Sequence, residues 1–127
     1  MQKQAVHSSD APAPVGPYSQ AIRAGDTVYC SGQIALDPET GTLVSGNIQR
    51  QTRQVLESLG MVLKGAGLGF TDVVSVAVFM TDLCDFAKMN EVYASYFTQM
   101  PPARCVVEVS GLPKDASIEI SLVAVQQ

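Results

Sequence analysis

The sequence contains no tryptophan, a single histidine, His7, and only three cysteines, Cys30, Cys84 and Cys105. One histidine and three scattered cysteines without C-x-x-C spacing suit neither a catalytic zinc site nor a disulfide framework, so the sequence predicts no bound metal. Each cysteine lies in or beside an apolar run, and we interpret all three as small buried hydrophobic residues. Cys105 has a second interpretation as a reactive thiol, because the neighbouring cation of Arg104 would lower its pKa.

Basic residues and long apolar runs are also scarce. Eight lysines and arginines stand against twelve aspartates and glutamates, a formal net charge of −4, which argues against a phosphate-binding surface and a nucleic-acid partner. There is no run of 18 apolar residues and no signal-peptide pattern, so we expect a cytoplasmic protein with no membrane span. At 127 residues the chain predicts one domain, 1–127, that folds without disulfides.

Hydrophobic patterning predicts a sheet of short strands with two helices. We expect strands where β-branched and apolar residues form short segments bounded by glycine or proline: 19–23, 27–31, 42–44, 73–80, 101–109 and 117–125. Apolar residues at helical spacing predict helices over 47–64 and 82–98. The order β-β-β-α-β-α-β-β is typical of an α+β fold in which both helices pack on one face of a mixed β-sheet.

Three local expectations accompany this fold. The polar, proline-rich residues 1–17 predict an arm that lies over the fold, outside the core. The glycine-rich segment 65–69 follows a helix and lacks the lysine and spacing of a phosphate loop, so it predicts a helix C-cap and turn. The continuously apolar segment 73–80 predicts a central strand that is covered on both faces.

Arg104 and Glu119 are charged residues within two of the predicted strands. Arg104 follows two prolines, whose fixed φ angles make the approach to it stiff, and Glu119 interrupts an apolar strand. A structural interpretation is that Arg104 protects an edge strand from aggregation while Glu119 faces solvent. A functional interpretation is that the guanidinium binds a carboxylate through two parallel hydrogen bonds and the separate carboxylate holds or activates water.

Four motifs carry a resemblance that extends over residues 12–126. They are Gly16-Pro17-Tyr18-Ser19-Gln20-Ala21, then Ser31-Gly32-Gln33-Ile34, then Asp85-Phe86-Ala87-Lys88-Met89-Asn90, and finally Pro101-Pro102-Ala103-Arg104 followed by a Val-rich strand, Gly111-Leu112-Pro113-Lys114-Asp115-Ala116 and Ile118-Glu119-Ile120. In kind and in order these motifs resemble those of the reactive intermediate deaminase family, RidA, also called the YjgF family.

The resemblance implies a chorismate-mutase-like fold and a homotrimer with clefts between its subunits. It implies a hydrolase acting on C=N bonds, which converts 2-imino acids and enamines such as 2-aminoacrylate and 2-iminobutanoate into 2-keto acids and ammonia without a cofactor. By motif, Arg104 would grip the substrate carboxylate and Glu119 would position the attacking water. The residues that would line the rest of the pocket are Tyr18, Ser31, Gly32 and Asn90.

Several alternatives stay open on the residues alone. Gly32 also suits a bulge or turn, and Asn90 also suits a helix surface.

The chain departs from the family pattern at two places. Val106 stands where family members usually carry cysteine, and the segment 97–101 is shorter than usual; both differences bear on substrate preference. Apolar strand residues without obvious cover, such as Val106 and Val123, agree with a buried trimer interface.

Two other functional classes also fit some features of the sequence. One is a non-catalytic sensor that binds keto acids through Arg104, which would bind without turning over an imine. The other is an RNA-directed translation inhibitor or ribonuclease, as some relatives are described, but the net negative charge argues against it.

Overall fold

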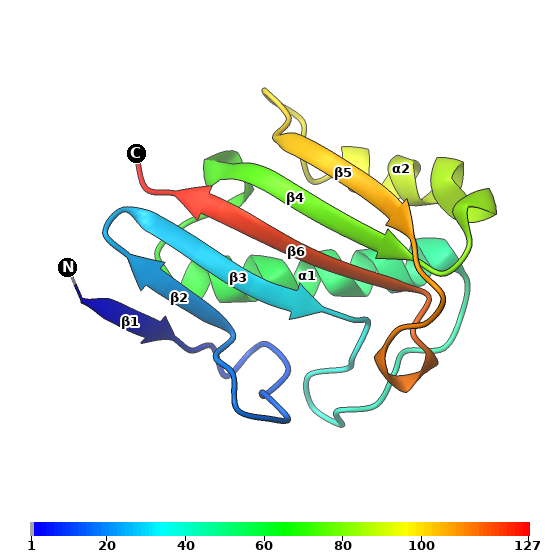
Figure 1. The fold of residues 1–127 in the computed structure, drawn as a ribbon, viewed down its shortest axis with the longest axis horizontal. Helices are drawn as coiled ribbons and strands as arrows, with labels where there is room; N and C mark the ends of the chain where they lie inside the picture. Colours follow the sequence, from blue (N-terminus) through cyan, green and yellow to red (C-terminus); the bar gives the residue numbers. More distant parts are fainter. Residues whose placement is uncertain (1) are drawn as a thin grey trace.

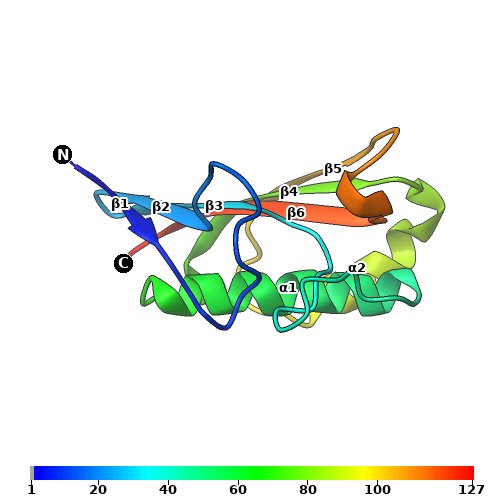
Figure 2. The ribbon, with the colours of Figure 1, turned by 90° about the horizontal axis from the view of Figure 1, so that it is seen from below.

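The computed structural model describes residues 2–127, which form one six-stranded mixed sheet with both helices on the same face (Figures 1 and 2). The strands are β1 Lys3–Val6, β2 Ala21–Ala24, β3 Thr27–Gln33, β4 Val73–Met80, β5 Ala103–Glu108 and β6 Ile118–Val125. Their order across the sheet is β1-β2-β3-β6-β4-β5; β4 and β5 pair in parallel and the other neighbours pair antiparallel. The helices are α1 Ile48–Gly65 and α2 Phe86–Ala94, with 3₁₀ turns η1 Phe70–Asp72, η2 Leu83–Asp85 and η3 Pro113–Asp115. The predicted α+β class is confirmed.

Helix α1 begins and ends where its sequence signals predict. The Asn47 side chain accepts a hydrogen bond from the Arg50 N–H and caps the first turn. At the other end Gly67 has a φ of +76° and the Leu68 N–H donates to the Leu63 carbonyl, the arrangement of a Schellman cap. The glycine-rich segment is therefore a helix C-cap and turn.

No helix within residues 2–127 is both long enough and apolar enough to cross a membrane.

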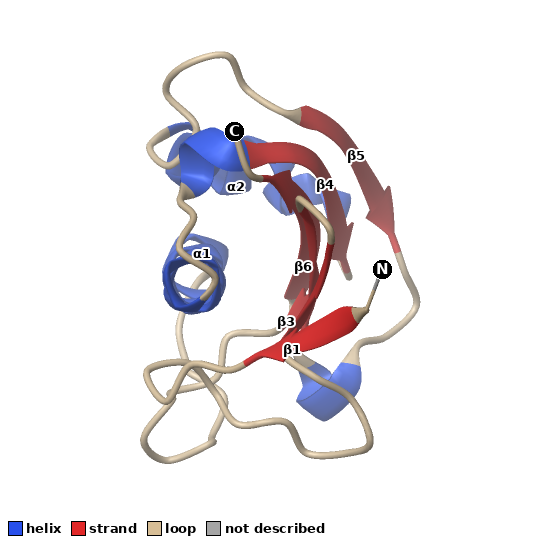
Figure 3. Cartoon of the chain, turned by 90° about the vertical axis from the view of Figure 1, so that its left-hand side faces the viewer, coloured by secondary structure: helices blue, strands red, loops and turns tan. Residues whose placement is uncertain are grey.

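The core lies between α1 and the helix-facing side of the sheet (Figure 3). Strand β6 alternates strictly between buried and half-buried residues, and its buried members face the helices: Ile118, Ile120, Leu122 and Ala124. The apolar stripe of α1 covers them with Val55, Leu56, Leu59, Val62 and Leu63. Complete burial of each such side chain contributes about 1.5–3 kcal/mol to folding, so this layer holds β3, β6 and β4 in register.

The opposite side of the sheet, which we call the open face, is covered by neither α1 nor α2 (Figures 2 and 3). The expectation that β4 is covered on both faces is wrong for the isolated chain, because Ala77 and Phe79 are only half-buried. Tyr29 and Val107 on the same side are 52% and 42% exposed. The continuously apolar segment 73–80 is therefore a strand whose second face is only partly covered within residues 2–127.

Three further expectations need correction. The segment 1–17 does not lie wholly outside the core, because Val6 and Ala11 belong to it and β1 pairs antiparallel with β2 as one sheet edge. Residues 42–44 form no strand; Leu43 makes only an isolated bridge with Leu36. Val106 is not uncovered either: it lies opposite Val78 and packs against the core, whereas Val123 is on the open face.

Candidate functional site

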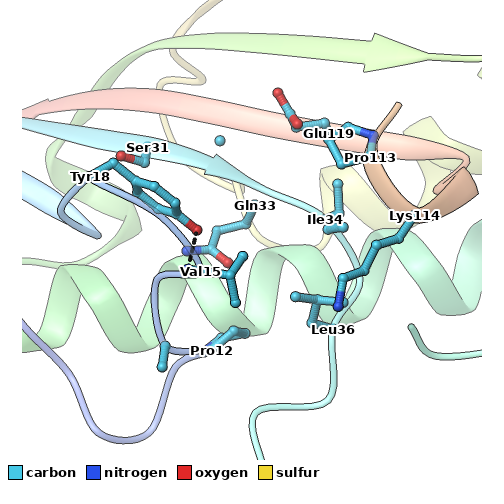
Figure 4. Close-up of a pocket in the computed structure, with 12 residues that line it drawn as sticks. Pro12, Val15, Tyr18, Ser31, Gln33, Ile34, Leu36, Pro113, Lys114 and Glu119 are labelled. Carbon is cyan, nitrogen blue, oxygen red and sulfur yellow. Dashed lines mark hydrogen bonds between the residues drawn. The ribbon is translucent and has the colours of Figure 1, made fainter. Parts of the chain in front are cut away.

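A cavity of about 330 Å³ lies beside the end of β3, and we call it the Glu119 cavity (Figure 4). The segment between β1 and β2, residues 7–18, forms one wall and is called the arm below. Strand β3 with the residues that follow it forms the second wall, and η3 closes the third side. Its lining residues are Pro12, Ala13, Val15, Tyr18, Ser31, Gly32, Gln33, Ile34, Leu36, Pro113, Lys114 and Glu119. A mostly apolar lining with few polar groups is typical of small-molecule sites.

Glu119 is half-buried and lies directly against Gly32 on the neighbouring strand. A Cβ built on Gly32 would be 2.7 Å from Glu119 Oε2 and 2.9 Å from its Cδ. The strand pairing also shifts register between Cys30 and Gln33, so Gly32 lies at an irregularity of the β3–β6 ladder. The absence of a side chain at Gly32 therefore leaves the space that the Glu119 carboxylate occupies.

Ser31 joins the two walls of the cavity, and Tyr18 belongs to the wall formed by the arm. The Ser31 hydroxyl donates a 2.6 Å hydrogen bond to the Ser19 carbonyl, and the Ser31 N–H donates to the Gln20 carbonyl at 2.9 Å. These bonds hold the end of the arm beside β3. The Tyr18 ring is about half exposed, and its hydroxyl accepts a long hydrogen bond from the Val15 N–H at 3.5 Å (Figure 4).

Arg104 belongs to a second cavity, about 470 Å³, which we call the Arg104 cavity. It is formed by α2 and the segment leading into β5, and its lining residues are Asn90, Tyr93, Ala94, Phe97, Pro101, Pro102 and Arg104. The guanidinium donates a 2.7 Å hydrogen bond to Asn90 Oδ1, and its central carbon lies 4.6 Å from the centre of the Tyr93 ring and 5.6 Å from that of Phe86. Burial raises the pKa of Tyr93, and the positive charge of Arg104 opposes that rise.

The predicted site residues therefore divide into two groups. Tyr18, Ser31, Gly32 and Glu119 line one cavity, while Asn90 and Arg104 line the other. Strand register explains the division: Arg104 lies opposite Val76 on the helix-facing side, whereas Glu119 lies opposite Phe79 on the open face. One chain does not bring its Arg104 and Glu119 into a common cavity.

The structure adds two residues to the ones that the sequence singled out for a role. Lys114, from the Gly-Leu-Pro-Lys motif, lines the Glu119 cavity with a backbone φ of +57°, and its Nζ donates to the Gly41 carbonyl at 3.2 Å. Tyr93 stacks beside Arg104, although its helical spacing indicates only a core position. Nothing in the sequence indicates the positive φ of Lys114. Its role in lining the cavity could have been predicted, because Lys114 belongs to the fourth motif.

The thiols are arranged differently from the expectation that all three are buried. Cys30 is buried, and burial raises its pKa to about 12. Cys84 and Cys105 are exposed, and a hydrogen bond with Asp82 raises the pKa of Cys84. Cys105 points to the open face, away from Arg104, because consecutive strand residues face opposite sides. Within residues 2–127, no three histidine, cysteine or acidic side chains gather as metal ligands would.

Comparisons with known proteins agree over nearly the whole chain. The family model described as Endoribonuclease L-PSP matches residues 8–126. A RutC family protein of Pyrococcus horikoshii is 52% identical over 98% of this chain and 99% of its own length. The human protein named 2-iminobutanoate/2-iminopropanoate deaminase is 44% identical over 98% of this chain and 90% of its own length.

Solved structures give the same relationship. A Rid family protein, YyfA of Yersinia pestis, superposes with a TM-score of 0.95 at 42% identity, covering 98% of this chain and 99% of that one. The structure of E. coli TdcF with bound serine superposes with a TM-score of 0.93 at 38% identity, covering 98% and 99%. The likeness in backbone therefore extends over the segments that form both cavities.

Proposed function

The chain belongs to the Endoribonuclease L-PSP family, the family of the reactive intermediate deaminases that its motifs resemble, and we propose that it hydrolyses 2-imino acids and their enamine tautomers to 2-keto acids and ammonia. Similar proteins carry the name of this activity, the human one among them. The preferred substrates are expected among 2-iminobutanoate, 2-iminopropanoate and the enamine 2-aminoacrylate.

The observation that carries the proposal is the complementarity of the two cavities. The Glu119 cavity has a carboxylate and an apolar wall, and the Arg104 cavity has a guanidinium held by a neutral amide. Hydrolysis of a 2-imino acid needs both groups, because a cation is needed to bind the substrate carboxylate and a carboxylate is needed to position the water that attacks the C=N carbon. Two copies of the chain would supply them together if Arg104 of one faced Glu119 of the next.

We propose that this pairing occurs in a homotrimer with clefts between its subunits. The open face supports the assembly, because within residues 2–127 Tyr29 and Val107 are exposed and Phe79 is only half-buried. In a closed ring each subunit contributes two different surface patches, one to each neighbour, and both patches are used on every subunit. The register that separates Arg104 and Glu119 within one chain then becomes the reason that each cleft needs two chains.

In the proposed reaction the substrate enters as a protonated imine with its carboxylate on Arg104. Glu119 accepts a hydrogen bond from a water, and the water oxygen attacks the imine carbon as the proton passes to the carboxylate. The resulting carbinolamine collapses when that proton moves to nitrogen: the C–N bond breaks and the hydroxyl proton passes to the Glu119 carboxylate as the C=O bond forms. Glu119 then gives this proton to the departing ammonia, so that the products are the 2-keto acid and ammonium. Atoms balance with one water consumed. Positioning and proton transfer suffice, because a protonated imine is already electrophilic.

The decisive assay generates the imine in situ with an amino-acid oxidase and measures whether the protein accelerates release of keto acid and ammonia. Arg104→Ala should lower kcat/KM about ten- to a hundredfold or more, since hydrogen bonds to charged groups contribute about 1.5–3 kcal/mol. Arg104→Lys should rescue poorly, because an ammonium lacks the planar fork. Arg53→Ala on the exposed surface of α1 is the matched control and should match wild type.

The result also separates the other functional classes. Wild-type protein that binds 2-oxobutanoate but leaves the imine lifetime unchanged would identify a keto-acid sensor and refute the enzyme. Protein that does neither but binds RNA with a steep salt dependence would support the RNA-directed class.

A further inference from the structure

We propose that Gln20 is a positioning residue for the Glu119 cavity: its side-chain amide holds the arm against β3 and thereby sets the distance between the two walls. The inference rests on the proposed function and adds to it a residue that touches neither substrate nor reacting atoms. Gln20 lies just before β2, two residues after Tyr18, and is only 1% exposed.

All the hydrogen bonds of the Gln20 side chain go to the backbone of the arm. Its Oε1 accepts from the Ser8 N–H at 2.7 Å, and its Nε2 donates to the Ser8 carbonyl at 3.1 Å and to the Pro12 carbonyl at 2.9 Å. One amide thus fastens the arm at two places four residues apart. The second of these residues, Pro12, lines the cavity together with Ala13, so the wall of the cavity begins where Gln20 binds the arm.

The Gln20 main chain makes the link to the opposite wall. Its carbonyl accepts from the Ser31 N–H at 2.9 Å, and the adjacent Ser19 carbonyl accepts from the Ser31 hydroxyl at 2.6 Å. Ser31 is followed by Gly32, over which the Glu119 carboxylate lies. Gln20 is therefore bonded to the arm through its side chain and to β3 through its backbone, with the cavity between the two.

Only an amide side chain meets the hydrogen-bonding needs at this position. The arm presents one N–H and two carbonyls that have no strand partner, so the buried group must both accept and donate. An aliphatic side chain would leave the Ser8 N–H and the Pro12 carbonyl unpaired, and would leave the Ser8 carbonyl with only the long hydrogen bond from the Ala11 N–H at 3.4 Å. A carboxylate would face two carbonyls without a proton to donate. The segment 8–13 would then lose its fixed place, while Glu119 and Gly32 on β6 and β3 would keep theirs.

The test compares wild type with Gln20→Met, which keeps length and volume, and Gln20→Glu, which keeps shape and the acceptor for Ser8. Thr52→Val is the matched control, because Thr52 is also buried, would lose one hydrogen bond, to the Ile48 carbonyl, and is not a lining residue of the Glu119 cavity. Two quantities are measured: amide hydrogen exchange of residues 8–18, and kcat and KM for 2-iminobutanoate generated in situ.

We expect both Gln20 variants to exchange the 8–18 amides at least about tenfold faster and to raise KM about tenfold, with kcat within about threefold of wild type. Thr52→Val should change neither exchange in the arm nor KM. Unchanged exchange in the arm would overturn the proposal, as would faster exchange with an unchanged KM. Loss of the folded protein in both variants would make Gln20 a folding residue and would overturn it too.

The proposed function can fail separately. If wild type hydrolyses no imine but binds 2-oxobutanoate, calorimetric affinity replaces KM, and the Gln20 variants should bind about tenfold more weakly. Equal affinity in all variants would then overturn the role of Gln20. A wild type that neither hydrolyses the imine nor binds the keto acid would refute both proposals.

Discussion

Restoring activity by mixing two inactive variants is the most direct test of a site shared between chains. Arg104→Ala should lack the carboxylate-binding group and Glu119→Gln should lack the water-orienting one. In separate preparations Glu119→Gln should lose about 10²-fold or more in activity, as is usual when an acid–base group is removed. Arg104→Ala should lose about ten- to a hundredfold or more, because it removes hydrogen bonds to the substrate carboxylate. Because the two residues lie on opposite faces of the sheet, neither defect lies in the cavity of the other.

The recovery expected in mixed trimers follows from chance assembly. In a ring built from equal amounts of both variants, a cleft is intact when the chain giving Arg104 is the Glu119→Gln variant and the chain giving Glu119 is the Arg104→Ala variant. The probability of that pairing is about one half times one half over all trimers. Every trimer that contains both variants has one such cleft out of three, so purified mixed trimers should recover about a third of the wild-type activity. That is about thirty times the residual activity of a variant that has lost 10²-fold, and about three times that of one that has lost tenfold.

The assay uses two affinity tags, sequential purification of the mixed oligomer and imine turnover per chain. Variants purified separately and mixed on ice immediately before the assay are the control and should stay inactive. Mixed oligomers with no more activity than the separate variants would refute the shared cleft. Isolation of a stable monomer with full activity would refute it by another route.

Three further predictions concern single residues or conditions. Gly32→Ala should keep the fold and lower kcat about tenfold or more, because its Cβ would be 2.7 Å from Glu119 Oε2 and would displace the carboxylate. Gly111→Ala is the control, because there is open space around Gly111. A wild-type kcat in Gly32→Ala would contradict the prediction. Turnover should survive dialysis against EDTA; activity that is lost and then restored by a metal would contradict a reaction carried by Arg104 and Glu119 alone. The buried Cys30 thiol has a raised pKa, so the stability that it contributes in the protonated form should be complete below its unfolded pKa of about 9 and be lost as pH rises toward 12. The difference in unfolding free energy between wild type and Cys30→Val should therefore change between about pH 9 and 12 and stay constant from about pH 6 to 8.

Local patterns predicted the helices and the central strands. Helix α1 is marked by an apolar stripe, an Asn47 cap and Gly67 at the turn, and each of these signals acts within a few residues. Strand β1 has no such signal, because an edge strand with three exposed residues among its four shows no apolar alternation. Its pairing with β2 depends on the rest of the sheet, which explains why the sequence predicts no strand within residues 1–17.

The facing of the site residues could not be predicted from the sequence. Arg104 and Glu119 both interrupt apolar strands, but the side of the sheet on which each lies is set by the pairing register, and a shift of one residue would exchange the sides. The same holds for β4, whose apolar residues look alike in sequence although Val78 is buried under the helices and Phe79 is on the open face. Motifs identified the residue types of the site; register decided which cavity each one lines.

Asn90 allows a last prediction, which concerns the charge available to a substrate. Its Oδ1 holds the Arg104 guanidinium at 2.7 Å without neutralising it, so the positive charge remains for a carboxylate ligand. Asn90→Asp preserves the shape but adds an anion, which should compete with the substrate and raise KM about tenfold while changing stability by less than about 1 kcal/mol, as for exposed ion pairs. Asn47→Asp adds the same charge at the cap of α1, where aspartate caps as well as asparagine, and should leave KM unchanged. A wild-type KM in Asn90→Asp would mean that Arg104 meets the substrate without depending on a neutral neighbour, and the assignment of the carboxylate to Arg104 would lose its electrostatic basis.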